Sequence, residues 1–285
     1  MKLNEDKLAI ISVQGSVDHP GLRNGGYRVG YDGYGRITMG TGGITYNYKI
    51  GDSCMGIEGD HVEPGVSLAN SNGSQNNALI AYACVGNIAK IVSGDAKGKC
   101  GFVTGKHGGV DHVMVYFDEE TLDQMTTDDK VLIKAQGLGL KLVDHSDIQV
   151  MNIDPNLLKL MGIKENGDGI EVPVVTCVPA CLMGSGLGEA TIMMGDYDIM
   201  TQDKDMNAQY GINELRFGDL VAVLDHDNHN GPHYRKDAIS IGVVVHSDSF
   251  TSGHGPGLTI VLSSKTNNIK PIIDKNANIA TYLLK

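Results

Sequence analysis

Short apolar runs, each bounded by Gly, Asp, Asn or Pro, recur along most of the chain. Many of these runs are rich in β-branched residues, which is typical of β-strands between turns. Helical patterns are fewer. The runs predict strands at 8–13, 89–92, 101–104, 113–117, 130–135, 172–177, 220–224, 239–246 and 258–263.

The helical signals consist of short segments that follow an N-cap residue, whose side chain can accept a hydrogen bond from the first turn. The predicted helices, each with its cap, are 75–85 (Ser74), 119–125 (Asp118), 156–161 (Asp154) and 206–210 (Asp205). Together with the strands they predict a mainly β, β-rich α+β fold: short-strand barrels or sandwiches with a few short helices.

The segment 89–117 has the rhythm of a compact β-meander, in which three strands are separated by glycine turns. It is similar to the small SH3-like barrels found in ribosomal proteins. We expect an N-terminal β-rich domain over 1–136 that contains this meander. A C-terminal β-rich domain over 137–285 is expected to carry a cluster of His and Asp residues.

Composition and charge narrow the function classes. Aromatic residues make up 5% of the chain and Trp is absent, so the core must be built from aliphatic residues and Met. The 34 acidic residues outnumber the 23 basic ones, which gives a net charge of -11. A nucleic-acid partner is not expected, because binding a phosphate backbone requires a basic face.

Targeting signals are not recognised. The apolar run near the N-terminus is shorter than a signal peptide requires, and no apolar stretch is long enough for a membrane-spanning helix. The five cysteines form an odd number, which fits reduced thiols better than a disulfide framework. We therefore expect a cytoplasmic protein with no membrane partner. A homo-oligomer is also expected.

Residues 225–254 hold five of the ten histidines. If 220–224 and 239–245 are antiparallel neighbours, the polar loop from Asp225 to His233 lies at one end of the pair and His246 at the other. The two groups are then too far apart to bind one ion. The loop is either a separate, solvated feature or folds back over the sheet to join the site. Four residues are the predicted ligands of a divalent Zn, Mn or Fe ion at the second end: Asp219, His246, Asp248 and His254.

Three further polar clusters could complete a site. Asp60 and His61 lie in an acidic turn, and the glycines after Lys106 and His107 allow a ligand to approach the backbone closely. Lys106 is either an ion-pair residue or a binder of substrate carboxylate or phosphate. The predicted substrate-binding residues are Asp60, His61, Gly184, Ser185 and Gly186, and the predicted catalytic residues are Lys106, His107 and Glu189, the last as general base.

Four segments carry a resemblance to a known family: 94–117, which includes GKHGG; 178–200; 215–227; and 241–264, which includes GHGPG. They resemble the uncharacterised bacterial domain of unknown function 4438 family. The resemblance implies a mainly β fold with an N-terminal and a C-terminal part and implies no reaction. The stretches FGDLVAVLD and MGSGLGEATIMMGD are also similar to acetamidase/formamidase-type proteins, in which acidic and glycine-rich turns frame a metal-dependent amide hydrolysis site.

Two functions from different classes fit these observations. The first is a metal-dependent hydrolase or lyase acting on a small anionic or amide-bearing metabolite, in which the ion lowers the pKa of bound water. The second is a non-catalytic metabolite-binding or assembly protein. Metal content separates the two.

Overall fold

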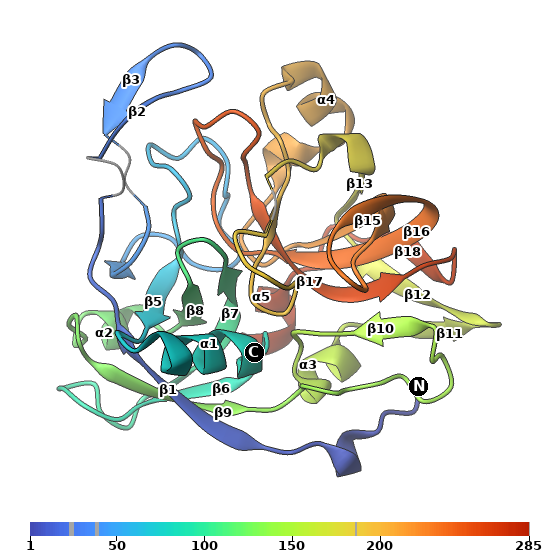
Figure 1. Ribbon diagram of the computed structural model, residues 1–285. Coiled ribbons are helices and arrows are strands. Elements are labelled where there is room, and N and C mark those ends of the chain that lie inside the picture. The colour runs from blue at the N-terminus through green and yellow to red at the C-terminus, as the bar shows by residue number, and fades with distance from the viewer. Residues whose placement is uncertain (23–25, 38–39, 186, 285) are drawn as a thin grey trace.

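The N-terminal part of the chain folds into an antiparallel β-barrel, seen at the lower left of the computed structural model (Figure 1). The structure describes residues 1–22, 26–37, 40–185 and 187–284. Within them, six strands pair in a closed ring, because the first also pairs with the last, and β4 (Ile44–Thr45) adds to β5. In ring order the strands are β1 (Ile11–Val17), β9 (Lys130–Ala135), β6 (Ile88–Ile91), β7 (Cys100–His107), β8 (His112–Tyr116) and β5 (Gly65–Ala69).

A second, six-stranded sheet is formed by the C-terminal part. Its path is β10 (Ile148–Val150), β17 (Gly257–Ser264), β16 (His233–Val244), β15 (Leu220–Asp227) and β13 (Thr176–Pro179), and β14 (Tyr197–Asp198) pairs with β17. A small sheet of β11 (Lys164–Asn166), β12 (Gly169–Val174) and β18 (Ile269–Ile273) lies beside it. The mainly β fold predicted from the sequence is therefore confirmed.

The helices are short and lie at the edges of the sheets (Figure 1). They are α1 (Gly73–Tyr82), α2 (Glu119–Leu122), α3 (Pro155–Leu160), α4 (Lys204–Gln209) and α5 (Ile279–Leu283). Asn72 rather than Ser74 caps α1, and Asp203 rather than Asp205 caps α4, whereas Asp118 and Asp154 cap α2 and α3 as predicted. No helix in the described ranges is long and apolar enough to span a bilayer.

The hairpin of β2 (Tyr27–Val29) and β3 (Gly35–Ile37) projects from the body at the upper left of Figure 1. Its strands expose large apolar side chains, among them Tyr27, Val29 and Ile37. Phe250 holds the turn of this hairpin, because its carbonyl accepts from the backbone N–H of Tyr31. The expected homo-oligomer stays a prediction.

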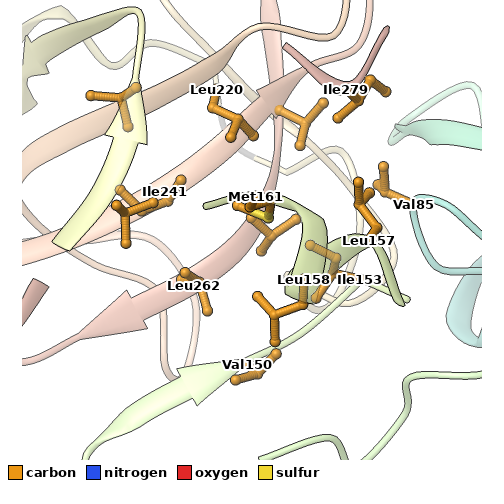
Figure 2. Close-up of a cluster of buried hydrophobic side chains, with 14 of the residues drawn as sticks. Val85, Val150, Ile153, Leu157, Leu158, Met161, Leu220, Ile241, Leu262 and Ile279 are labelled. Atoms are coloured by element: carbon orange, nitrogen blue, oxygen red, sulfur yellow. The ribbon is translucent and has the colours of Figure 1, made fainter. Parts of the chain in front are cut away.

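Aliphatic clusters form the core, as the composition predicted. One fills the barrel with side chains such as Val66, Val103 and Ile133. Another joins α3 to the second sheet, and Figure 2 shows Leu157 and Leu158 within it, among the residues that close the space between helix and strands. Burying one such side chain contributes about 1.5–3 kcal/mol. These cores hold the sheets in fixed positions.

The end of β7 joins the barrel to the second sheet. The N–H of Lys106 donates to Oγ1 of Thr259 on β17 (3.0 Å), and that hydroxyl donates to the carbonyl of Lys106 (3.2 Å). Gly105 lies directly on Val245, where an added Cβ would come within 2.0 Å of Cγ1. These contacts bring His107, the last residue of β7, beside the segment that follows β16.

Candidate functional site: a buried histidine and aspartate cluster

A cavity of about 260 Å³ is lined by residues of the N-terminal part and of the C-terminal part. Histidines and carboxylates stand together in its wall, and most of them are buried. The titratable residues that line it are Arg28, Asp60, His61, His107, Asp196, Asp198 and His254. His246 lies directly behind them, with a fully buried ring.

His61 occupies a loop that is fixed by the segment after β16. Its backbone has a φ of 55°, and its N–H donates to the carbonyl of Asp248 (3.2 Å). A positive φ is uncommon for a residue other than glycine and is found at functional sites more often than elsewhere. Nδ1 lies 3.1 Å from Oδ2 of Asp60, whose other oxygen accepts from the hydroxyl of Ser249 (2.7 Å). This pairing turns Nε2 of His61 toward the interior of the cluster.

His107 is oriented by a buried carboxylate in the same way. Its Nδ1 lies 2.6 Å from Oε1 of Glu63, so the proton on Nδ1 is held there. Its ring stacks on that of His246, with 4.2 Å between the ring centroids and 30° between the planes. Carboxylate-paired histidines are typical of metal sites, because the pairing fixes the tautomer and leaves the other nitrogen free to bind.

Glu63 is the centre of a wider network. His112, which faces His107 across the β7–β8 pair, places Nδ1 2.9 Å from Oε2 of Glu63 and Nε2 3.0 Å from Asp18. The hydroxyl of Ser67 also donates to Glu63 (2.6 Å). Burial opposes a charge on His112, but the carboxylates of Glu63 and Asp18 outweigh it and raise the His112 pKa to about 9. His112 is therefore an imidazolium at neutral pH.

His246 directs an unshared nitrogen at a carboxylate. Its Nδ1 donates to the carbonyl of Ser247 (2.9 Å), which leaves the lone pair on Nε2. Nε2 lies 2.7 Å from Oδ2 of Asp196, yet the two atoms do not meet in hydrogen-bonding geometry and neither makes a hydrogen bond within the described chain. Buried polar atoms without partners are costly. A cation between them would satisfy both.

Asp198 connects the remaining histidines. Its Oδ1 lies 3.4 Å from Nε2 of His246, and its Oδ2 lies 2.8 Å from Nδ1 of His254 and 3.5 Å from Nε2 of His61. Burial raises the pKa of Asp198, but its close contacts with the three histidines outweigh this effect and hold the pKa well below its usual range. The Asp196 and Asp198 charges likewise raise the His246 pKa well above normal, against the effect of burial. The buried carboxylates therefore favour the binding of positive charge, which protons or a metal ion can supply.

Donor atoms from these residues approach one another closely enough to bind metal. They form three overlapping triads, each with all its donor atoms within 4.8 Å of one another. The triads are His61, His107 and His246; His61, Asp198 and His254; and Asp196, Asp198 and His246. Imidazole nitrogens combined with carboxylate oxygens suit Zn, Mn or Fe.

Two glycines explain why backbone can pack so closely against the cluster. A Cβ on Gly257, in the GHGPG stretch, would lie 2.0 Å from Oδ2 of Asp196 and 2.3 Å from Nε2 of His246. A Cβ on Gly108, in the GKHGG stretch, would lie 1.8 Å from the carbonyl oxygen of Leu187. Gly108 also donates its N–H to Oδ1 of Asp196 (2.7 Å). The glycines of these two stretches therefore let the backbone lie against the ligating side chains, where any larger residue would clash.

The structure brings several of the predicted residues together. His246 and His254, the predicted ligands after the apolar strand, both contact Asp198. Asp60, His61 and His107, predicted in other clusters, line the same cavity, as does Ser185. The segment Asp225–His233 lies at the far end of the β15–β16 pair, as expected, but only residues 228–232 form the loop, because β15 continues to Asp227 and β16 begins at His233. Asp227 pairs there with His229 (2.7 Å).

Two predicted ligands lie outside the cluster. Asp219 pairs with Arg216 (2.8 Å) and accepts from the side chain of Asn278 (2.7 Å). Asp248 accepts hydrogen bonds from the hydroxyl of Thr201 and the N–H of Ser249. β16 ends at Val244, so the alternation expected to carry His246 and Asp248 on one face does not extend to them.

Lys106 is likewise turned away from the cavity. Since successive strand residues face opposite ways, its side chain enters the interior while His107 lines the site. Its Nζ donates to Oδ1 of Asn152 (2.8 Å) and the carbonyl of Met193 (2.6 Å), and burial lowers the Lys106 pKa to about 8. Lys106 therefore does not reach a ligand in the cavity. It links β7 to Asn152 and Met193 in the interior instead.

The remaining predicted residues belong to the glycine-rich loop before β14. Gly184 packs on Gly253, and an added Cβ would come within 2.0 Å of its carbonyl oxygen, but Gly184 does not line the cavity. Gly186 lies outside the described residues. Glu189 follows Gly188, which lines the cavity, and is itself half-buried beside Asp111.

Comparison with known proteins adds a family. The chain matches the model of a domain of unknown function, DUF4438, in two parts: its N-terminal domain over residues 27–159 and its C-terminal domain over 159–283. The chain belongs to the DUF4438 family. A crystal structure of a protein called TM1086 is 48% identical to it, with a TM-score of 0.95 and coverage of 99% of each chain. A search of the curated proteins finds no match.

The site of this DUF4438 protein is shared between the two matched regions. His61 and His107 come from the N-terminal region, and Asp196, Asp198 and His246 from the C-terminal one. The sequence analysis missed both aspartates and Glu63. Asp196 is the last residue of the selected stretch MGSGLGEATIMMGD and Asp198 follows two residues later, and this spacing was the available signal. Glu63 lies in the same acidic turn as Asp60 and His61 but was not selected, because its importance depends on partners 44 and 49 residues away.

Proposed function

We propose that this chain is a divalent-metal-dependent hydrolase or lyase acting on a small anionic or amide-bearing metabolite. The observation that carries the proposal is the pairing of Nε2 of His246 with Oδ2 of Asp196, two buried atoms 2.7 Å apart that lack hydrogen-bonding geometry. His61 and His107 support it, because each holds Nδ1 on a carboxylate. A divalent ion bound there would polarise a carbonyl and lower the pKa of bound water.

The cavity supports a small, negatively charged substrate. Its volume of about 260 Å³ lies just below the range of about 300–1,000 Å³ typical of sites for drug-sized ligands, which suits a small metabolite. Arg28 lines it, and within the described chain the Arg28 guanidinium makes no hydrogen bond or ion pair, so it is available to a substrate carboxylate or phosphate. Ser185 adds a hydroxyl to the same wall. Arg28 thus takes the role that the sequence analysis gave to Lys106.

Glu189 is proposed as the general base. The neighbouring Asp111 carboxyl, together with burial, raises the Glu189 pKa to about 7, which suits proton transfer at neutral pH. Carboxyl ¹³C NMR of glutamate-labelled protein should show one residue titrating near pH 7. The signal should vanish in Glu189→Gln and shift toward an ordinary pKa in Asp111→Asn. A titration near pH 7 that persists in Glu189→Gln contradicts this assignment.

Metal content tests the proposed function most directly. Native protein should contain stoichiometric Zn, Mn or Fe by elemental analysis, and His246→Ala should lose it because the variant lacks the buried donor nitrogen. His233→Ala is the matched control: His233 is half-exposed and lies in the other histidine cluster, beside Asp227, so its metal content should be unchanged. Metal-free native protein that takes up no ion on reconstitution would favour a non-catalytic metabolite-binding protein.

A further inference from the structure

We infer that the cluster holds two divalent ions rather than one, bridged by the carboxylate of Asp198. The inference rests on the proposed function, since it concerns the same metal site. Six residues contribute donors: His61, His107, Asp196, Asp198, His246 and His254. Their arrangement decides between one ion and two.

The donors are spread too widely to bind a single ion. Ligand atoms about 2.1 Å from one ion lie at most about 4.2 Å from each other, on opposite sides of it. Six donors of one ion would therefore form one group within 4.8 Å, whereas they form three overlapping triads. His107 and Asp196 share no triad with His254. The cluster is elongated, with His107 and Asp196 toward one end and His254 toward the other.

Asp198 lies between the two ends and faces each with a different oxygen. Oδ1 is the atom near Nε2 of His246 (3.4 Å), at the end that also holds Asp196. Oδ2 is the atom near His254 (2.8 Å) and His61 (3.5 Å). A carboxylate whose oxygens face separate sets of nitrogens has the arrangement of a bridging ligand. A single-ion site would need only one of these oxygens.

The surrounding charge matches two divalent ions. Asp196 and Asp198 supply two negative charges in direct contact with the histidines. Two more stand behind them, on Asp60 beside His61 and on Glu63 beside His107. The imidazolium of His112 is shared between Glu63 and Asp18, which offsets its positive charge. The charge of these four carboxylates exceeds that of one divalent ion and equals that of two.

Two ions narrow the reaction class. Sites with two metals about 3.5–4 Å apart stabilise both the attacking and the departing group of a displacement at a carbonyl or phosphoryl centre. This chemistry is hydrolysis rather than elimination. The inference therefore favours the hydrolase over the lyase, with an amide, ester or phosphate bond of an anionic metabolite placed between the cluster and Arg28.

Metal stoichiometry distinguishes this inference from the proposed function itself. Chelator-treated protein titrated with Mn²⁺ or Zn²⁺ should bind two equivalents, by calorimetry and by elemental analysis after gel filtration. One equivalent at saturation would overturn the two-ion centre and leave a metal-dependent enzyme standing. No binding would overturn both.

Variants at the two ends sharpen the test. His254→Ala should reduce the stoichiometry from two to one, because His254 contributes to one end only, and Asp198→Ala should impair both ions. His233→Ala should still bind two. With Mn²⁺, wild-type protein should give the electron paramagnetic resonance signal of an exchange-coupled pair and His254→Ala that of an isolated ion. Two bound Mn²⁺ ions without coupling would overturn the Asp198 bridge.

Discussion

Replacing Glu63 with alanine is expected to lower the free energy of unfolding by about 3–5 kcal/mol, the loss typical of breaking a buried charge pair from one side. The Glu63 side chain is fully buried and accepts from His107, His112, Ser67 and the N–H of Gly42. Each donor loses its partner in the variant, and the His112 imidazolium retains only Asp18. Urea denaturation followed by circular dichroism measures the change.

Two variants control this experiment. Glu58→Ala removes an exposed carboxylate from the same stretch of chain and should change the free energy of unfolding by less than about 0.5 kcal/mol. Glu63→Gln keeps the side-chain volume and one acceptor oxygen. Its loss in unfolding free energy should lie between those of Glu58→Ala and Glu63→Ala. A Glu63→Ala variant as stable as wild type would show that the network does not hold the fold.

The stability lost in Glu63→Ala should depend on pH, because His112 in the same network titrates. The His112 pKa is raised from 6.5 to about 9 in the folded protein, so its stabilising contribution is complete below pH 6.5 and disappears as the pH rises through 9. The shift corresponds to about 3 kcal/mol. The gap in unfolding free energy between wild type and Glu63→Ala should therefore narrow between pH 6.5 and 9. Comparing the two proteins at each pH cancels the opposing contribution of Lys106, whose pKa is lowered.

Substituting Gly257 with alanine should weaken metal binding by roughly 100-fold or more, the upper range for changes that displace ligands indirectly. One added methyl group would occupy the space between Oδ2 of Asp196 and Nε2 of His246, at 2.0 and 2.3 Å. Either a ligand or the β17 backbone must shift, and β17 is fully buried. Competition with a metallochromic chelator measures the affinity.

A glycine elsewhere provides the matched control. Gly73, at the start of α1, has no atom within 4 Å of an added Cβ, so Gly73→Ala should leave metal affinity unchanged. Circular dichroism must show that Gly257→Ala remains folded, so that the effect is assigned to the site. Unaltered metal affinity in folded Gly257→Ala would contradict the proposed position of the ion.

Strand patterns predicted the class of fold because most strands are bounded by turn residues. The strand at Lys130–Ala135 was predicted at its observed bounds. β1 was predicted at 8–13 but spans Ile11–Val17, because Gly15 was taken as a boundary. Gly15 in fact lies inside the strand, where Leu68 and Leu79 leave no room for a Cβ. The closure of β1 on β5 also could not be predicted, since it joins residues 53 and 51 apart.

The site was predictable as a set of segments but not as an assembly. His246 and His254 follow a strongly apolar strand, and that local pattern identified them. Asp219 belongs to the correct end of the sheet, but Arg216, three residues earlier, is close enough to bind it. His107 reaches His246 because the end of β7 packs on β17, through contacts such as Lys106 with Thr259. His61 reaches it because its loop binds the segment after β16. A chain read in sequence order does not reveal that contact.

With the proposed ions bound, the division of their ligands between the two family regions would make metal binding and tertiary structure interdependent. Ions that bind only the assembled cluster add to the stability of the whole chain in proportion to the logarithm of free metal over its dissociation constant, about 4 kcal/mol at a 1,000-fold excess. His61 and His107 on one side, and Asp198 and His246 on the other, would separate only when that contribution is lost. The lifetime of this protein against proteolysis would then follow the metal supply of the cell, independently of any substrate.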